Sequence, residues 1–592
     1  MCGIVGTVSS NNLRSFLING LKSLEYRGYD SAGIATISDN KFELFRSVGR
    51  VELLTKKLPT NLKGTIGIGH TRWATHGEPL EKNCHPLTSF HDLFTIVHNG
   101  VIENFQELKS ELINNGYEFS SDTDTEVIVN ILDQEYLKTN NILDAISNSL
   151  KRIEGSLAIA ILFKNDSSRL YFAKRKSPLL IGIGKDTNYL ASDALPMINY
   201  ANKFVDLTND EYGYISKSEV HVYKNNIEQK LKYTERNAEL LNADLNGYPH
   251  YMLKEIEEIP SCIMRLIDNY FQNNQYKFNS EMLEALLNAD TISFIACGTS
   301  YHACLLGKHY MEKIGKHSEA YIASEWAYFP HFNNREKEIF ILVSQSGETA
   351  DVITCLQTIN KNNYKSITIT NTKGSTLERD ATWSCLLYAG VEIAVASTKA
   401  YASQVALLYL LSSAIVHNTS SIKILKDNNV ALDNIISIKE EIKEIAYEIK
   451  DVNNAFFLGR GTDYYVALEA SLKLKEITYI HSEAFPGGEL KHGPLALVEK
   501  NTPIFGFITL PEISAAMRGN FSEVKARNAK VYSFVTKNLA SKDDTIIIDN
   551  LNRDISALAI VMVAQYLAYY TALARNNDID KPRNLAKSVT VE

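Results

Sequence analysis

The first residue of this chain whose type could do chemistry is a cysteine in position 2. If the initiator Met1 is removed, Cys2 becomes N-terminal and carries both a thiol and a free α-amine. The amine has a reference pKa of about 7.7–8.0, so it can accept a proton near neutral pH while the thiolate attacks an electrophile. The alternative for this end is a signal peptide, but the basic n-region and the longer apolar segment are missing. Cys2 is therefore a candidate nucleophile that other residues must support.

Three polar clusters follow that a fold alone does not require. They are Glu25–Ser31, His70–Gly77, and His98–Gly100 followed by Asp122–Glu126. Each has an ordinary structural explanation, since Asn-Gly is a common turn sequence, Asp122–Glu126 is typical of a helix N-cap and a single arginine is often solvated. Their joint occurrence behind Cys2 favours a catalytic site over these separate explanations.

Cys2 together with these clusters resembles the class II glutamine amidotransferases, whose nucleophile is N-terminal. The resemblance implies a sandwich of two sheets covered by helices, and hydrolysis of L-glutamine to glutamate and ammonia. Cys2 would be the nucleophile, and Asn99 with the Gly100 N–H would form an oxyanion hole, in which one donor is typically worth about 2.7–4 kcal/mol. The implied substrate contacts are Arg72 on the α-carboxylate, Asp124 on the α-ammonium, Trp73 as a gate for ammonia, and Thr75 and His76 beside them.

Hydroxyl-rich turns lead into helical patterns in the second half of the chain. The strand-like run Glu338–Val343 is followed by Ser344–Thr349 (SQSGET), and Glu392–Lys399 (EIAVASTK) is a similar polar turn before an apolar helix. Hydroxyls and backbone N–H groups at a helix N-terminus bind phosphate well. A capped helix without a ligand is the alternative for any one such turn. The GxxxxGK[ST] loop of nucleotide-binding proteins is missing, which favours a sugar phosphate over ATP.

This half of the chain also repeats itself. Ile292–Ala296 followed by Cys297–Tyr301 (CGTSY) corresponds to Ala455–Gly459 followed by Arg460–Tyr464 (RGTDY), and Ile322–Glu325 is echoed by Ile480–Glu483. The elements alternate as strand, turn and helix, a pattern typical of a parallel sheet. The sequence therefore predicts two related α/β domains.

These features resemble sugar-isomerase (SIS) domains, which are phosphosugar binders with a flavodoxin-like parallel sheet. A pair of them behind an N-terminal glutaminase is similar, over essentially the whole chain, to the isomerising aminotransferases that use L-glutamine and D-fructose 6-phosphate. The resemblance implies D-glucosamine 6-phosphate and L-glutamate as products, an enclosed route for ammonia between the two sites, a homodimer, and no metal or organic cofactor.

Turning a 2-ketose phosphate into a 2-amino aldose requires ring opening, imine formation at C2 and proton transfer between C1 and C2, hence acid–base groups. The resemblance assigns proton transfer to Glu476 and ring opening to His492 of the partner subunit. It places Lys473 near the developing oxyanion and Lys587 at a Schiff base with the open-chain ketose. The implied sugar and phosphate contacts are Thr299, Ser300, Ser344, Gln345, Ser346, Thr349, Val395 and Ser397.

The elements that must position these residues suggest several domains. Up to about Gly213, short strand-like runs such as Gly3–Val8 alternate with a few helical patterns, among them Leu13–Leu24 and Phe105–Asn114. This alternation is typical of layered α+β structure. We expect an α/β multidomain chain with an N-terminal αββα sandwich of the N-terminal-nucleophile hydrolases, followed by two flavodoxin-like SIS domains. The predicted bounds are 2–213 for the glutaminase, 214–264 for a linker, 265–425 and 440–575 for the SIS domains, and 576–592 for a catalytic tail.

Composition limits the classes of protein to which the chain can belong. It has 592 residues and a net charge of −8, without a basic block, which argues against nucleic acid as a partner. Its seven cysteines are scattered and show no CxxC pair, which indicates a reduced, cytoplasmic chain without structural zinc. The longest apolar run, Ala557–Ala574, contains Gln565 and Thr571, so a buried core helix is favoured over a membrane span.

Two other functions remain as alternatives. A glutamine-dependent enzyme acting on a phosphoribosyl compound would need a diphosphate-binding loop in the C-terminal half, and none is found. A phosphosugar sensor with a decayed glutaminase would have lost catalytic residues, and none is lost. Departures from the family pattern are confined to Ile259 before Pro260 and to Phe485–Gly487. The connector lacks the long insertion of many eukaryotic members, which indicates the bacterial type and leaves feedback control open.

Overall fold

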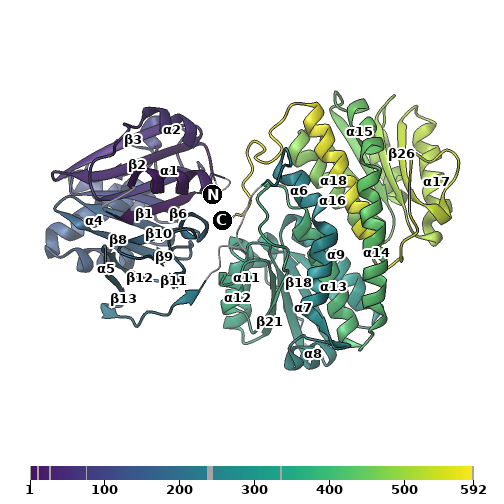
Figure 1. Cartoon of the computed structure of the whole chain (residues 1–592), viewed down its shortest axis with the longest axis horizontal. Helices are drawn as coiled ribbons and strands as arrows, with labels where there is room; N and C mark the ends of the chain where they lie inside the picture. The colour runs from purple at the N-terminus through teal and green to yellow at the C-terminus, as the bar shows by residue number, and fades with distance from the viewer. Residues whose placement is uncertain are drawn as a thin grey trace. The chain divides into compact units, whose positions relative to one another are not determined.

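The computed structural model describes residues 2–9, 13–25, 28–74, 76–235, 245–333 and 337–589. By its internal contacts the chain separates into two units, of which the first runs to Asn242 and the second covers Ala243–Lys587 (Figure 1). Each unit has hydrophobic cores of its own.

Two antiparallel sheets form the centre of unit 1. In spatial order the described strands of the first sheet are β15 (Thr234–Glu235), β11 (Lys203–Asp206), β9 (Leu180–Ile183), β10 (Asn188–Ala191), β1 (Gly3–Val8), β4 (Ile66–Arg72), β2 (Ser31–Ser38) and β3 (Lys41–Val48). Those of the second are β14 (Ile227–Glu228), β13 (Val220–Lys224), β12 (Glu211–Ile215), β8 (Asp166–Arg175), β7 (Gly155–Phe163), β6 (Phe94–Ile102) and β5 (Leu87–Thr88). Side chains of both sheets, such as Ile4, Ile68, Val97 and Phe172, meet in one buried core.

Helices cover the outer face of each sheet of unit 1. The first sheet carries α1 (Leu13–Leu24) and α2 (Val51–Lys57), and the second carries α3 (Phe105–Asn114), α4 (Asp124–Thr139) and α5 (Ile142–Arg152). Leu17, Leu21 and Leu24 recur at helical spacing, so one face of α1 is apolar and is buried against the sheet. The four layers confirm the predicted αββα sandwich.

Two parallel sheets with the same strand order form unit 2. The described strands of the first are β19 (Ser318–Ile322), β18 (Thr291–Ala296), β20 (Glu338–Val343), β21 (Lys365–Thr370) and β22 (Trp383–Leu386). Those of the second are β24 (His481–Pro486), β23 (Asn454–Gly459), β25 (Pro503–Ile508), β26 (Lys530–Thr536) and β27 (Ile546–Ile548). The matching order confirms the predicted pair of related flavodoxin-like domains.

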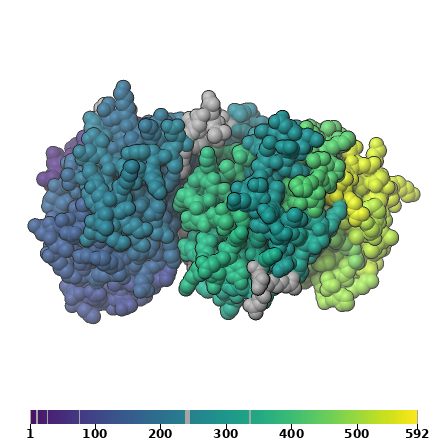
Figure 2. Space-filling view, turned by 90° about the horizontal axis from the view of Figure 1, so that it is seen from below, coloured from purple at the N-terminus to yellow at the C-terminus, as the bar shows by residue number. Residues whose placement is uncertain are grey.

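A shared helical core joins the two repeats of unit 2. It is built by α9 (Gly298–Lys313), α13 (Lys399–Ile415), α16 (Thr462–Thr478) and α18 (Ser556–Ala574). Other helices pack around the sheets, namely α6 (Tyr251–Glu257), α7 (Ile259–Tyr270), α8 (Ser280–Leu287), α10 (Ala323–Tyr328), α11 (Ala350–Lys361), α12 (Thr376–Asp380), α14 (Ser420–Ser437), α15 (Lys439–Glu448) and α17 (Pro511–Lys525). The repeats form a continuous surface, from the green of the first to the yellow of the second (Figure 2).

The structural role of two segments depends on the parts of the protein that pack against them. Helix α18 is long and apolar enough to span a membrane, but 89% of its apolar window is buried within the protein, in agreement with the predicted core helix. The polar segment predicted as a linker (214–264) contains regular structure: β13, β14 and β15 extend the sheets of unit 1, while α6 and α7 belong to unit 2. Short edge strands with exposed polar side chains carry little of the periodicity from which a strand is predicted.

Candidate functional site

Cys2 lies directly before β1, a central strand of the first sheet of unit 1. Because Gly3 pairs with Thr71 of β4, the register places Cys2 beside the end of β4 and Trp73. The Trp73 N–H donates to Cys2 Sγ at 3.2 Å. Burial raises the pKa of the Cys2 thiol, while the Trp73 N–H and the charge of Arg72 act in the opposite direction. The thiol thus lies in a pocket that already contains a donor for its anionic form.

Asn99, on β6 of the second sheet, points its amide at Cys2. Its Nδ2 donates to the Cys2 carbonyl oxygen at 3.0 Å. His70 Nε2 lies 3.0 Å from Asn99 Oδ1 and 2.9 Å from the His98 carbonyl oxygen. Both are acceptors, so this nitrogen carries the proton, and burial lowers the pKa of His70 to about 3, which keeps the ring neutral. His70 therefore fixes the orientation in which the Asn99 NH₂ faces Cys2.

Gly100 has a backbone conformation that other residues rarely adopt. Its φ is +142°, and a Cβ atom built on it would lie 2.0 Å from the Ser156 carbonyl oxygen of the neighbouring strand β7. A glycine is therefore required where the chain passes the Asn99 amide. Asn99 is thus in contact with Cys2, and Gly100 follows it directly on β6.

The predicted ligands of the glutamine α-groups lie in the same part of unit 1. The Arg72 guanidinium donates to the carbonyl oxygens of His76, Gly77 (3.0 Å) and Glu78 (3.4 Å), so in this structure it holds the loop after β4. Arg72 is buried and close enough to Cys2 to lower the pKa of its thiol. Thr75 lies outside the described residues.

Asp124 begins α4 and is 4% exposed. Its Oδ2 accepts the Ile102 N–H at 3.0 Å, and its charge acts on the pKa of Cys2 and of His98. The ring of His76 packs edge-on against Phe105, with centroids 4.9 Å apart. Apart from Thr75, the predicted glutaminase residues are thus gathered around the β1–β4–β6 strands.

In unit 2 the hydroxyl-rich turn follows β20, next to the turn that follows β18. Strands β18 and β20 are parallel neighbours, so their carboxyl ends meet at one edge of the sheet, where ligands bind in doubly wound folds. Ser344 Oγ accepts the Gly347 N–H at 3.1 Å and lies 2.8 Å from Thr349 Oγ1. Gly347 has φ +66°, and a Cβ there would lie 2.1 Å from Ser375 Oγ.

Other predicted sugar contacts flank this edge. Ser346 Oγ accepts the Glu348 N–H at 3.2 Å, and the Gln345 carbonyl oxygen accepts the Asn371 N–H at 3.0 Å. Ser300 Oγ accepts from Gln404 Nε2 at 2.9 Å. The side chains of Gln345 and Ser346 are half-buried, which leaves them partly accessible to a ligand.

The second repeat contributes a row of charged residues from α16. Glu469, Lys473 and Glu476 recur at helical spacing and share one face. Lys473 is fully buried, and its Nζ lies 3.0 Å from Thr299 Oγ1, 2.5 Å from Glu476 Oε2 and 3.5 Å from Glu469 Oε1. The other carboxylate oxygen of Glu469, Oε2, lies 2.7 Å from His302 Nδ1. Thr299 of the first repeat is thus joined to the acid–base groups of the second.

Burial and neighbouring charges shift the pKa values of Lys473 and Glu476 in ways that suit different roles. Burial alone would lower the pKa of Lys473, but Glu469 and Glu476 outweigh it, so the pKa is raised and the amine stays protonated. Burial raises the pKa of Glu476, and the charges of Lys473 and Lys587 act against that shift. A carboxyl group with a raised pKa beside an ammonium group is suited to accept and return a proton.

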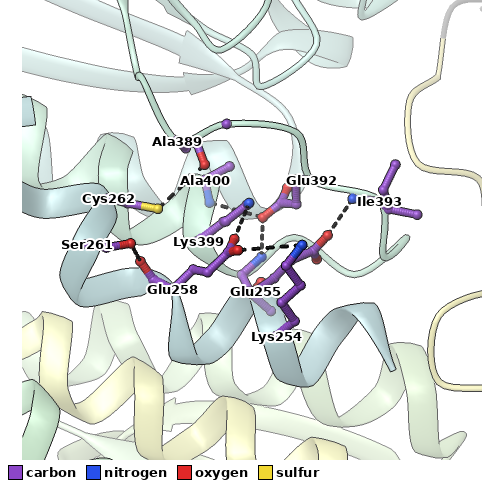
Figure 3. A network of polar contacts seen from close by, with 12 residues as sticks. Lys254, Glu255, Glu258, Ser261, Cys262, Ala389, Glu392, Ile393, Lys399 and Ala400 are labelled. Atoms are coloured by element: carbon purple, nitrogen blue, oxygen red, sulfur yellow. Dashed lines mark hydrogen bonds and ion pairs between the residues drawn. The ribbon is translucent and has the colours of Figure 1, made fainter. Parts of the chain in front are cut away.

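Lys587 and Ser397 meet at a buried carboxylate that the sequence did not single out. Glu392 Oε2 accepts from Ser397 Oγ at 3.0 Å and from Lys587 Nζ. Figure 3 shows Glu392 in a network of polar contacts with Glu255, Glu258 and Lys399. The Val395 N–H donates to the Asp580 carbonyl oxygen at 2.9 Å, which ties the same loop to the C-terminal segment.

His492 is not brought into this cluster. It ends the 3₁₀ turn Gly487–His492, and its side chain is exposed. The sequence also missed His70, Glu255 and Glu392, because a buried histidine or carboxylate has no spacing pattern that separates it from a surface one. Their partners are recognisable only once the strands and loops are in place.

The two repeats differ in the turns that follow their corresponding strands. Where the first repeat has Ser300, the second has Asp463, whose carboxylate accepts the Thr509 N–H at 2.9 Å and the Thr509 hydroxyl at 2.6 Å. Asp463 is 1% exposed, and burial raises its pKa to about 6. The Asp463 carboxylate therefore already accepts the hydrogen bonds that the residue after β25 could offer to an anion. We expect an anion to bind in the first repeat rather than here.

Comparison with known proteins assigns the family. The family model of the glutamine amidotransferase domain matches residues 70–198, and that of the SIS domain matches residues 285–414 and 448–575. A glutamine–fructose-6-phosphate aminotransferase (isomerizing) of Staphylococcus epidermidis is 44% identical over 605 residues, and one of Listeria innocua is 44% identical over 610, each covering 100% of both chains. This chain belongs to that family.

Glutamine–fructose-6-phosphate aminotransferases are enzymes, so this chain is an aminotransferase with a glutamine amidotransferase domain and two SIS domains. A solved structure, the C-terminal domain of glucosamine-fructose-6-phosphate aminotransferase from Francisella tularensis, is 36% identical. It aligns with 57% of this chain and 100% of its own length, with a TM-score of 0.53. The fold of unit 2 is therefore that of the family.

Proposed function

We propose that the chain converts D-fructose 6-phosphate and L-glutamine into D-glucosamine 6-phosphate and L-glutamate. The observation that carries the proposal is the cluster of Thr299, Lys473 and Glu476 beside the Ser344–Thr349 turn. It places a buried ammonium and a carboxyl of raised pKa next to a turn suited to phosphate. Acid–base isomerisation of a phosphorylated sugar requires this combination.

In the glutaminase half, the Cys2 thiolate attacks the amide carbon of glutamine while the α-amine of the mature N-terminus takes up the thiol proton. The C–S bond forms, the C–N bond breaks and ammonia leaves, after which water hydrolyses the thioester to glutamate. The Asn99 NH₂, held towards Cys2 by His70, and the Gly100 N–H stabilise the oxyanion of both steps. Arg72 and Asp124 bind the α-carboxylate and α-ammonium of the substrate.

In the sugar half, the hydroxyls of Ser344, Ser346 and Thr349 and the N-terminus of α11 bind the phosphate. Lys587 forms an imine with the open-chain ketose, ammonia replaces it at C2, and Glu476 carries the proton between C1 and C2. Lys473, permanently charged, stabilises negative charge that develops on the sugar oxygen.

Coupling of the two halves follows from the chemistry of ammonia. Ammonia is mostly protonated at neutral pH and is then not a nucleophile, so an enclosed route from Cys2 to the sugar avoids its loss. We further propose a homodimer in the cytoplasm, in which the exposed His492 serves the ring-opening step in the site of the partner subunit.

Two variants test the proposal in opposite directions. The wild-type chain should form glucosamine 6-phosphate from fructose 6-phosphate and glutamine, as measured by chromatography of the products. Cys2→Ala should release no glutamate and form no amino sugar from glutamine. Glu476→Gln should still release glutamate but form no amino sugar. Release of glutamate by the wild type without an amino sugar would contradict the proposed acceptor.

A further inference from the structure

A buried glutamate, Glu392, connects two parts of the proposed sugar site. It lies in the loop between β22 and α13, and its side chain is completely buried. Its Oε1 accepts the backbone N–H groups of Thr398 and Ala400, at 2.9 and 3.0 Å. Its Oε2 accepts from the Ser397 hydroxyl and from Lys587 Nζ. One carboxylate therefore has two distinct sets of donors.

The two oxygens of Glu392 serve different purposes. Oε1 caps the first turn of α13, which is an ordinary structural role. Oε2 brings the amine of Lys587 to the hydroxyl of Ser397, although the two residues are far apart in the sequence. Lys587 lies in a segment without helix or strand from Arg575 to the end of the described residues. Its position therefore depends on side-chain contacts, and its buried ion pair is with Glu392.

The surroundings favour the ionised form of the Glu392 carboxyl group. Burial raises the pKa of Glu392, but Lys587 and the N–H groups of Thr398 and Ala400 outweigh it and hold the pKa below its usual range. The neighbouring Glu255 accepts the Ile393 and Ala394 N–H groups, and burial together with the charge of Glu392 raises its pKa to about 8.

The other buried lysine of the network is paired separately. Lys399 Nζ lies 2.6 Å from Glu258 Oε2 (Figure 3). The carboxylate in contact with Lys587 Nζ is that of Glu392. Lys587 also acts on the pKa of Glu476, which places its charge close to the acid–base groups of α16. The Glu392 pair and the α16 cluster therefore face the same site.

We propose that Glu392 is a positioning residue for catalysis, which holds the amine of Lys587 beside Ser397 so that its nitrogen meets the carbonyl carbon of the sugar. The proposal rests on the function proposed above, in which Lys587 forms an imine. In that step the ammonium and the ketone give a protonated imine and water. The C–N bond replaces the C=O bond, and two of the three N–H protons leave with the oxygen. The ammonium first passes one of these protons to the ketone oxygen, because only the neutral amine can form the C–N bond. The nitrogen is cationic again once the imine has formed, so the Glu392 carboxylate faces a cation before and after the step.

The variant Glu392→Gln separates the capping of α13 by Oε1 from the contact of Oε2 with Ser397 and Lys587. The amide retains one carbonyl oxygen for the N–H groups of Thr398 and Ala400, but an NH₂ replaces the oxygen that accepts from Ser397 and Lys587. Glu258→Gln is the matched control, because it removes the partly exposed carboxylate that pairs with the buried Lys399 and with Lys254, without a contact to Lys587. Glu392→Asp keeps the charge and withdraws it by one methylene, and it serves if the glutamine variant does not fold.

The measurements are kcat and KM for glucosamine 6-phosphate formation, glutamate release, and the yield of the Lys587–sugar adduct trapped by borohydride and located by peptide mass spectrometry. Misplacement of a reacting group by about 1 Å costs about 100-fold in rate, so we expect such a loss in kcat and in trapped adduct for Glu392→Gln. Glutamate release should be unchanged. Glu392→Asp should lie between this variant and the wild type, and Glu258→Gln should stay within about threefold of wild type.

Three outcomes would overturn the proposal. One is wild-type kcat and adduct yield in Glu392→Gln, even with reduced stability, which would reduce Glu392 to a helix cap. Another is an equal loss in Glu258→Gln, which would indicate a general effect of the buried network. The third is a wild-type enzyme that forms glucosamine 6-phosphate without any adduct on Lys587. A wild type that forms no amino sugar at all would instead contradict the proposed function itself.

Discussion

At the scale of single residues, the structure explains how ordinary side chains become reactive or directed. The Asn99 NH₂ is directed towards Cys2 because a neutral His70 holds the Asn99 Oδ1. Lys473 stays charged in a fully buried position because two carboxylates of its own helix surround it. The partner of Asn99 lies on another strand, and the partners of Lys473 lie about one helical turn away on either side.

Asn99→Ala tests the oxyanion hole. Removal of one donor of this kind typically lowers kcat by about 10²–10³, so glutamate release should fall by that factor. Isomerisation of fructose 6-phosphate in unit 2 should be unaffected, and it serves as the internal control. A loss of glutaminase activity below tenfold would show that Asn99 does not face the oxyanion.

Glu255→Gln tests the buried carboxyl group of the network around Glu392. Burial and the charge of Glu392 raise its folded-state pKa to about 8, while the charges of Lys587 and Lys399 act in the opposite direction. Between the unfolded value of about 4.3 and the folded value, the native state binds a proton that the unfolded state does not. The free energy of unfolding of the wild type should therefore fall as pH rises through this window and level off above it.

A glutamine does not titrate at this position. The free energy of unfolding of the variant, relative to that of the wild type, should therefore increase from pH 5 to about pH 8 and then level off. Urea unfolding at several pH values measures the difference. A difference that is independent of pH would mean that Glu255 is ionised in the folded protein at neutral pH.

At the scale of elements, parallel strands and helix termini do most of the positioning. The carboxyl ends of β18 and β20 bring the turns at Thr299 and Ser344 together, and α16 supplies acid–base groups from the second repeat. The sequence predicted β1, α1 and α3 with their observed bounds, because their apolar periodicity is strong and their ends are marked by polar residues. It also predicted the repeat, since the turns after β18 and β23 share the residues Gly-Thr.

Some elements could not be predicted from the sequence, and the reason is physical. Strand β15 is an exposed, two-residue strand at a sheet edge, so its only signal is hydrogen bonding to β11, which is distant in the sequence. Glu255 and Glu392 likewise look like solvated carboxylates until the loop before α13 buries them. The chemistry-bearing motifs were thus accessible from the sequence, whereas the residues that hold them in place were not.

Gly347→Ala tests the turn between β20 and α11. Its φ of +66° and the 2.1 Å approach to Ser375 Oγ leave no room for a Cβ atom. The left-handed conformation alone costs roughly 1–2 kcal/mol for a residue with a side chain, so KM for fructose 6-phosphate should rise about tenfold or more. Gly519→Ala in α17 is the control, because its Cβ would meet open space and alanine favours the helix. Equal effects of both substitutions would contradict a specific role of the turn.

At the scale of the whole molecule, the chain consists of two units with separate cores and separate chemistry. Unit 1 gathers Cys2, His70 and Asn99, while unit 2 gathers the α16 cluster and the Lys587–Glu392 pair. The charged residues of each site are paired within their own unit. The proposed glutamine hydrolysis and sugar isomerisation therefore use residues of separate units.

Expression of residues 1–242 alone tests this separation. The unit should fold cooperatively, because its two sheets and five helices enclose their own cores in the described residues. It should release glutamate from glutamine without forming an amino sugar. Thermal unfolding and glutamate release are the measurements, and an unfolded or inactive product would show that unit 1 depends on the rest of the chain.

The central claim, that nitrogen passes from glutamine at Cys2 to the sugar at unit 2, is tested most directly with isotopes. The wild-type enzyme is given amide-¹⁵N-glutamine and fructose 6-phosphate in the presence of excess unlabelled ammonium. We expect glucosamine 6-phosphate that carries ¹⁵N almost completely, and no labelled product from Cys2→Ala. Amino sugar that carries mainly unlabelled nitrogen would contradict an enclosed transfer between the two sites.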